Sequence, residues 1–161
     1  GATSFSRLAH SSPVRLLPIS THATARAGAA WCASGTFGGG LLGGDVVDLD
    51  VRVGERASLA LVTQASTKVY RAKRDRQPVV QRLEARVLSG GLLLVAPDPL
   101  VPFAESLYEQ RLAFDLAGGS GAEAASLVVV DWLCAGRTAR GERWLLDGYR
   151  SRCQVSWRPH G

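Results

Sequence analysis

The sequence GGGLLGGDVVDLDVRV, residues 38–53, decides the fold, because a glycine-rich loop runs directly into a segment of alternating polarity. From Val46 to Val53 apolar side chains at odd positions alternate with mostly charged ones, a pattern typical of a β-strand with one buried face. The glycines satisfy the G-x-G-x-x-G fingerprint of dinucleotide sites, but that fingerprint requires a helix to begin at its third glycine. The strand therefore argues against a nucleotide site. We expect the bare backbone to allow close approach by a neighbouring strand or a partner protein.

The same two-strand unit recurs twice further along the chain. Each unit has an amphipathic lead-in strand, a glycine turn and a more apolar return strand. Lead-in strands are predicted at 46–53, 79–87 and 108–116, and return strands at 58–63, 92–96 and 126–133. The turns at Gly54, Gly90 and Gly119 lie about thirty residues apart, a spacing typical of stacked or wrapped β units. Because the return strands are apolar on both faces, we expect them to form an inner layer that is covered on both sides.

The first part of the chain adds an edge strand at 14–17, closed by Pro18, and a second strand at 31–37 that leads to the glycine loop. Helical periodicity is scarce, apart from a turn or two at 122–126. The sequence therefore predicts a mainly β protein, a wrapped and stacked, β-helix-like scaffold with few helices. A single domain is expected to span residues 1–161.

The excess of basic residues is modest. The chain of 161 residues has 19 basic and 14 acidic residues, a formal charge of +5, and 17 of the basic residues are arginine. The segment from Lys68 to Arg76 gathers five cations around Tyr70, which predicts either a rim that binds proteins or a basic, β-rich nucleic-acid-binding module. We favour the protein rim over a nucleic-acid partner, because arginine and tyrosine are enriched at protein interfaces.

The cysteines indicate the compartment rather than a site. Cys32, Cys134 and Cys153 are widely spaced and form no C-x-x-C pair, so neither a disulfide framework nor a structural zinc site is predicted. We expect a reducing, cytoplasmic location. No apolar run approaches the roughly 20 residues of a membrane span, so no membrane partner is expected. The chain contains no methionine, and we expect a processed chain or a fragment.

Carboxylates are the candidate metal-contacting groups. Asp131 ends the most apolar return strand and, if buried, needs a partner such as Arg137 or Arg140. Asp98 lies between two prolines, on a rigid corner. Oxygen ligands suit weak, transient contact with a divalent ion, for which the candidates are Asp45, Asp131 and Glu142. Since no nucleophile or base accompanies them, we expect no catalytic residues and no enzymatic activity.

Several blocks, taken together and in this order, resemble the family of the urease accessory protein UreD, also called UreH. The blocks are SPVRLLP at 12–18, GGGLLGGD at 38–45, TQASTKVY at 63–70, PDP at 97–99, the stretch from Asp131 to Arg137, and GERW at 141–144. The Pro-Asp-Pro and Val-Asp-Trp versions look like those of eukaryotic members. Because family members are longer, the resemblance implies that this chain holds the N-terminal and central part of the domain, and that the C-terminal part is absent.

The resemblance implies a non-enzymatic scaffold for nickel delivery. Such a protein binds urease apoprotein and, with UreF and the GTPase UreG, passes Ni²⁺ to the urease site, and it can be dimeric within that complex. No tightly bound cofactor is implied, only Ni²⁺ in transit through a polar internal passage. Asp45 and Glu142 are implied to line the passage. The other residues that the resemblance assigns to the passage wall or to a partner-facing surface are Gly39, Gly40, Gly43, Gly44, Thr63, Gln64, Thr67, Lys68, Tyr70, Asp98 and Arg137.

Overall fold

The computed structural model describes residues 2–20, 28–72 and 76–158, and within them the protein is mainly β, as predicted. The strands are β1 (Val14–Ile19), β2 (Ala30–Thr36), β3 (Val46–Val53), β4 (Ser58–Thr63), β5 (Lys68–Val69), β6 (Val79–Val87), β7 (Leu92–Ala96), β8 (Val101–Pro102), β9 (Leu107–Ala117), β10 (Ser126–Val129) and β11 (Gly148–Arg158). The helices are three-residue 3-10 turns: η1 (Phe37–Gly39), η2 (Gly121–Glu123) and η3 (Thr138–Arg140).

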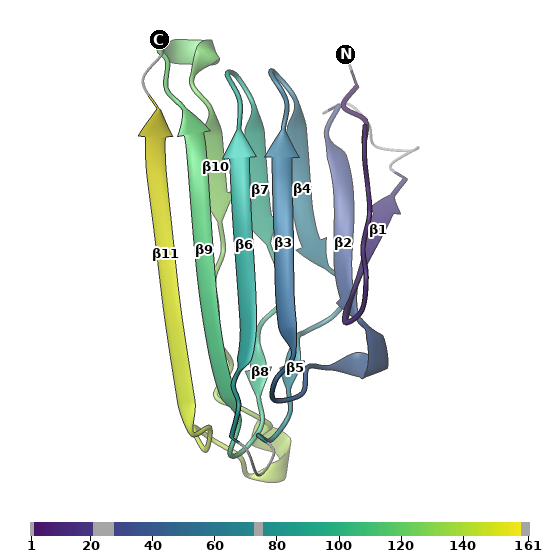
Figure 1. Ribbon diagram of the computed structural model, residues 1–161, viewed down its shortest axis with the longest axis vertical. Helices are drawn as coiled ribbons and strands as arrows, with labels where there is room; N and C mark the ends of the chain where they lie inside the picture. The colour runs from purple at the N-terminus through teal and green to yellow at the C-terminus, as the bar shows by residue number, and fades with distance from the viewer. Residues whose placement is uncertain (1, 21–27, 73–75, 159–161) are drawn as a thin grey trace.

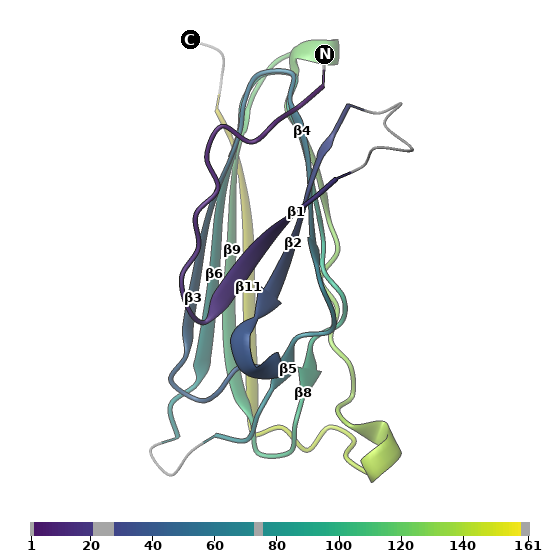
Figure 2. The ribbon, with the colours of Figure 1, turned by 90° about the vertical axis from the view of Figure 1, so that its right-hand side faces the viewer.

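The chain winds as a flattened coil between two sheets (Figure 1). Lead-in strands form one parallel sheet in the order β11-β9-β6-β3, and return strands lie in a second sheet in the order β1-β2-β4-β7-β10. Within the second sheet β2, β4, β7 and β10 are parallel, and only β1 runs antiparallel to its neighbour. Each pass runs up a lead-in strand and down a return strand. The small parallel pair β5–β8 lies along the connections to the next pass (Figure 2). The predicted wrapped stack is confirmed.

The inward side chains of successive passes stack in register. Leu49 pairs with Leu83, and Leu83 pairs with Leu112, so equivalent residues of three passes form one row. Together with Leu93 and Phe114 they belong to a core that the two sheets enclose. A repeated sequence pattern is stabilised in this way, because each pass buries its apolar face against the next pass and against the opposite sheet.

The expectation that the return strands form an inner layer is wrong. The molecule has two layers, and the return strands face the core on one side only. Leu93 is fully buried, whereas its neighbour Leu92 is 39% exposed and Val128 of β10 is 49% exposed. The error arose because a strand that is apolar on both faces has the same sequence pattern whether or not another part of the chain covers its outer face.

Other boundaries agree with the sequence in part. Strand β1 is the predicted edge strand, and β4 and β7 have the predicted bounds. Pro18 does not close β1, which continues to Ile19, because a proline is tolerated in an edge strand. Strand β10 ends at Val129, four residues earlier than predicted, and β5, β8 and β11 were not predicted at all. β11 pairs in parallel with β9 along its whole length, from Gly148 opposite Leu107 to Arg158 opposite Ala117.

Candidate functional site

A cavity of about 200 Å³ lies between the two sheets, where β4 and β7 end and where β3 and β9 begin. Its apolar lining includes Leu41, Val47 and Leu100, which belong to a second, smaller core cluster. The polar side chains that line it come from both sheets and from the loops that follow the return strands: Ser34, Thr36, Thr63, Gln64, Thr67, Gln81, Asp98, Tyr108, Gln110 and Asp131. The cavity is therefore a polar chamber that adjoins the apolar core clusters.

A chain of hydrogen bonds crosses the lead-in side of this cavity. The hydroxyl of Tyr108 donates to Oε1 of Gln81 at 3.0 Å, and Nε2 of Gln110 donates to Oδ2 of Asp131 at 2.7 Å. The same amide donates to Oγ of Ser151 at 3.0 Å, and that hydroxyl donates to Asp131 at 3.3 Å. Burial is the main cause that raises the pKa of Tyr108, so the phenol stays protonated. The two buried residues of this network, Tyr108 and Gln110, thus have hydrogen-bond partners for their side chains.

The opposite wall is organised by the Pro-Asp-Pro corner. The backbone N–H of Asp98 donates to Oγ1 of Thr63 at 2.7 Å, and that hydroxyl donates back to the Asp98 carboxylate at 3.2 Å. The indole N–H of Trp132 donates to the carbonyl of Pro97 at 2.8 Å. Oε1 of Gln64 accepts a bond from Arg15 at 3.1 Å. These contacts tie the ends of three return strands into one wall.

The cavity brings together several residues that the sequence singled out. They are Gly39, Thr63, Gln64, Thr67, Asp98 and Asp131. The partner expected for Asp131 was wrong: Arg137 pairs with Glu142 instead, and Asp131 accepts bonds from Gln110 and Ser151. An amide and a hydroxyl leave that carboxylate with its negative charge unneutralised at the cavity wall.

A second group of predicted residues forms a stack beside the cavity. The ring of Tyr70 lies against Gly40, where an added Cβ would come within 2.6 Å of a ring carbon, so only glycine fits. Tyr70 meets Phe103 edge to face at 5.1 Å between ring centroids, and the guanidinium of Arg137 lies 3.8 Å from the centroid of Phe103. The expected close approach to the glycine loop is thus made by the segment that follows β5.

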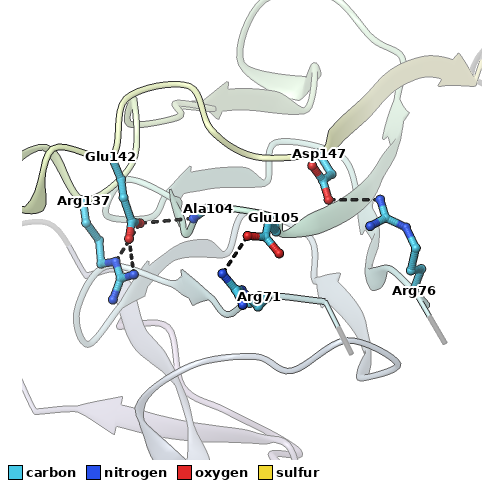
Figure 3. A network of polar contacts seen from close by, with 7 residues as sticks. All are labelled: Arg71, Arg76, Ala104, Glu105, Arg137, Glu142 and Asp147. Atoms are coloured by element: carbon cyan, nitrogen blue, oxygen red, sulfur yellow. Dashed lines mark hydrogen bonds and ion pairs between the residues drawn. The ribbon is translucent and has the colours of Figure 1, made fainter. Parts of the chain in front are cut away.

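Glu142 ends this stack with both carboxylate oxygens occupied (Figure 3). Arg137 donates to it through two nitrogens, one of them Nε at 2.8 Å, and the backbone N–H of Ala104 donates at 3.1 Å. The hydrogen bond from Arg137 is the main cause that holds the pKa of Glu142 below its usual range. The Gly-Glu block therefore fixes the loop after β10 to the turn before β9.

The remaining residues of the glycine block form a tight turn. The carboxylate of Asp45 accepts a bond from the backbone N–H of Leu42 at 2.8 Å, and Gly44 has a φ of +91°, which favours glycine. Asp45 and Gly43 are not among the residues that line the cavity. The side chain of Lys68 is exposed, and its backbone carbonyl accepts a bond from the N–H of Leu41 at 2.8 Å.

The basic segment after β5 is partly neutralised by nearby carboxylates (Figure 3). Arg71 pairs with Glu105 at 2.6 Å and Arg76 pairs with Asp147 at 3.0 Å. Two further cations of the segment, Lys73 and Arg74, lie outside the described residues. No observation in the described part of the segment supports the nucleic-acid alternative.

Sequence reasoning missed the cavity residues Gln81, Tyr108 and Gln110, and it also missed Ser151, which bonds to Gln110 and Asp131. One signal could have found them: Gln110 occupies an inward position in the otherwise apolar row of β9. Residues 2–20, 28–72 and 76–158 contain no cluster of three or more histidine, cysteine or carboxylate side chains that could hold a metal ion. The same ranges contain no helix that is long and apolar enough to cross a membrane.

Comparison with known proteins gives consistent matches. Residues 1–159 match the family described as "UreD urease accessory protein". A urease accessory protein UreD from Sorangium cellulosum is 49% identical over 158 residues, which is 97% of this chain and 46% of that protein. A second UreD, from Anaeromyxobacter sp., is 44% identical over 97% of this chain and 49% of its own length. Among eukaryotes, a urease accessory protein D from Oryza sativa subsp. indica is 40% identical over 86% of this chain and 44% of its own length. The chain thus spans about half the length of these relatives.

Proposed function

Because this chain belongs to the UreD urease accessory protein family, we propose that it takes part in urease maturation as a non-enzymatic scaffold. In this proposal the full-length protein binds urease apoprotein and, together with UreF and the GTPase UreG, passes Ni²⁺ to the urease active site. The proposal also places the protein in the cytoplasm, in keeping with three free cysteines.

The observation that carries the proposal is the polar cavity, which we assign to the path of the nickel ion. Its lining offers amide, hydroxyl and carboxylate oxygens, whereas imidazole and thiolate are the softer ligands that hold nickel firmly. An ion in transit must be bound well enough to enter and weakly enough to leave. Asp131 and Asp98 are both exposed side chains that line the cavity, so each can meet a hydrated ion from solvent.

We assign the direct ion contact to Asp131 first. Its carboxylate has no cationic partner among the hydrogen bonds and ion pairs of the described residues, whereas Glu142 is held by Arg137. Of the other predicted transient ligands, Glu142 has both carboxylate oxygens bonded to Arg137, and Asp45 accepts a bond from Leu42 and does not line the cavity. We therefore propose that these two shape the surrounding loops and contact nickel only after a rearrangement.

Deletion and complementation test the proposed function. A strain that lacks the gene for the full-length protein should produce inactive urease, and the wild-type gene should restore activity. Replacement of Asp131 by asparagine should lower the recovered activity at limiting nickel and leave the amount of urease apoprotein unchanged. Normal urease activity in the deletion strain would contradict the proposed function. Unchanged activity with the variant would remove only the role of Asp131.

A further inference from the structure

Three arginines lie side by side on the outward surface of β3, β6, β9 and β11, which we call the charged surface (Figure 1). Strand register places Arg82 of β6 opposite Arg111 of β9, and Arg111 opposite Arg152 of β11. We call these three residues the arginine row. Neighbouring strands lie about 4.8 Å apart, so the row spans about 10 Å. Like charges directly opposite each other in a sheet are destabilising, so the stability of the fold does not explain the row.

A second pair of opposed arginines on the same surface shows how such a contact is ordinarily neutralised. Arg52 of β3 lies opposite Arg86 of β6. Arg52 pairs with Asp50 at 3.4 Å, and Arg86 pairs with Asp115 at 3.3 Å. Each of these two arginines therefore has a carboxylate of its own.

Two members of the arginine row have no such carboxylate. Arg82 pairs with Asp48 at 3.0 Å. Within residues 2–20, 28–72 and 76–158, the side chains of Arg111 and Arg152 make no hydrogen bond and no ion pair. Both residues are exposed. Their guanidinium groups therefore turn unused N–H donors and two positive charges to solvent.

The nearest carboxylates do not satisfy these two arginines. Glu109 precedes Arg111 by two positions on the same face of β9, but it pairs with Arg150 at 3.3 Å. Glu84 lies in the next row, opposite Ala113, and forms no ion pair with Arg111 in the described part of the chain. The positive charge of Arg111 and Arg152 is therefore left for a group outside the described residues.

We propose that the arginine row binds a carboxylate-rich segment of a partner protein. A guanidinium and a carboxylate fit each other through two parallel N–H···O bonds. Two carboxylates about 5 Å apart, as at positions three or four residues apart on a helix, can meet Arg111 and Arg152 together. None of the three arginines lines the polar cavity, so the inference does not depend on the nickel path.

A nucleic acid fits this surface less well than an acidic protein does. Among the outward residues of β3, β6, β9 and β11 that the structure describes, none is aromatic, so no base could stack there. Asp48, Glu84 and Glu109 border the arginine row and would repel a continuous phosphate backbone. A short acidic segment can contact the arginines without passing over these carboxylates.

Two matched double variants of the full-length protein test the inference. Arg111→Gln with Arg152→Gln removes the unpaired arginines, whereas Arg52→Gln with Arg86→Gln removes the same charge from the opposed pair that has carboxylate partners. Binding of a fluorescent hexaglutamate peptide is measured by anisotropy at low salt. We expect the first variant to weaken binding about fivefold or more, because charge-assisted hydrogen bonds are lost. The second should weaken it by less than about twofold.

Two further measurements keep the comparison interpretable. Both variants should give the circular dichroism of wild type, because substitutions of exposed residues change stability little. If the first variant does not fold, Arg152→Gln alone is compared with Arg52→Gln. Binding to wild type should also weaken as salt is added, since the contacts are exposed and electrostatic.

The outcomes decide both the site and the class of partner. Weaker binding of the peptide with the first variant alone supports the inference. Equal weakening with both variants, or no binding to wild type, overturns it. Hexathymidylate is measured in the same way, and tighter binding of this oligonucleotide than of the peptide would overturn the choice of an acidic protein. The cavity residues are unchanged in both variants, so failure of the inference leaves the proposed function intact.

Discussion

The two outward surfaces of this coil are made by neighbouring strands of the same passes, yet they differ in almost every property of their side chains. The sheet of β3, β6, β9 and β11 turns charges to solvent and ties them together in ion pairs such as Arg82 with Asp48. The sheet of β4, β7 and β10 turns leucine, valine and alanine outward. Both sheets enclose the same core. The inward side chains therefore determine the fold, while the outward side chains indicate what each surface contacts.

The largest expected effect is on stability, and it separates inward from outward residues of strand β7. Leu93 is fully buried and Leu92 is 39% exposed, so the two leucines are a matched pair on one strand. Leu93→Ala should lower the free energy of unfolding by about 2–5 kcal/mol, because it removes buried methylene groups and leaves a cavity. Leu92→Ala should lower it by less than about 1 kcal/mol. Urea unfolding of both variants measures the two values. Equal losses would mean that the outward surface is packed in solution.

A smaller effect is expected from dye binding to the two surfaces. The fluorescence of anilinonaphthalene sulfonate rises on exposed apolar surface. Leu92→Lys combined with Val128→Lys should lower the fluorescence of the bound dye by roughly half, because both side chains belong to one apolar patch. Val46→Lys on the charged surface is the control and should change it little. Strong residual fluorescence in the double variant would place the dye site elsewhere.

The ion pairs on the outward surface of β3, β6, β9 and β11 should contribute less to the free energy of unfolding than the buried residues of the core. Asp115 meets Arg86 at 3.3 Å and also pairs with Arg158, so it joins three strands of the sheet. Asp115→Asn should lower the free energy of unfolding by about 1 kcal/mol or less, since these arginines are exposed to solvent. The loss should shrink as salt is added. A loss that is insensitive to salt would show that Asp115 acts through packing rather than charge.

The smallest expected effect concerns pH and comes from the Arg137–Glu142 pair, in the loop between β10 and β11. The pKa of Glu142 is held below its usual range chiefly by the bond from Arg137. Its contribution to stability is therefore present above the ordinary glutamate pKa of about 4.3 and is lost as pH falls through the lower pKa of the folded protein. Glu142→Gln should remove that part of the acid dependence, as measured by unfolding between neutral and acidic pH. An unchanged pH profile in the variant would contradict the assignment.

The strands could be predicted where their signals are local. Alternation and glycine turns give β3, β4, β6 and β7 almost to the residue, because both depend only on neighbouring positions. β11 was missed because its inward positions, among them Ser151 and Cys153, are not uniformly apolar, and because its pairing with distant β9 supplies its hydrogen bonds. The sequence also could not predict what covers the outward face of the return strands, since an apolar strand pattern carries no information about its cover.

The candidate site could be predicted only in part for a related reason. Thr63, Gln64 and Asp98 stood out because their neighbours form distinctive blocks. Strand register brings Gln110 to the cavity and Ser151 to the hydrogen bonds at its wall, and their contacts with Asp131 span 21 and 20 residues. Spatial convergence of this kind follows from the pairing of strands and not from spacing along the chain. The partner of Asp131 was misassigned for the same reason.

The most direct test of the account is the nickel content of urease matured in a reconstituted system. Urease apoprotein, UreF, UreG and the full-length protein are mixed with GTP and limiting Ni²⁺, and nickel per urease is then measured by elemental analysis. Gln110→Leu, which keeps the side-chain size and removes the amide at the cavity, should lower nickel incorporation about tenfold or more, since catalytic and transport sites depend on their hydrogen-bonded second shell. Glu109→Leu changes the adjacent outward residue of β9 and should leave incorporation near the wild-type value. Equal nickel contents with wild type, Gln110→Leu and Glu109→Leu would contradict the cavity as the nickel path.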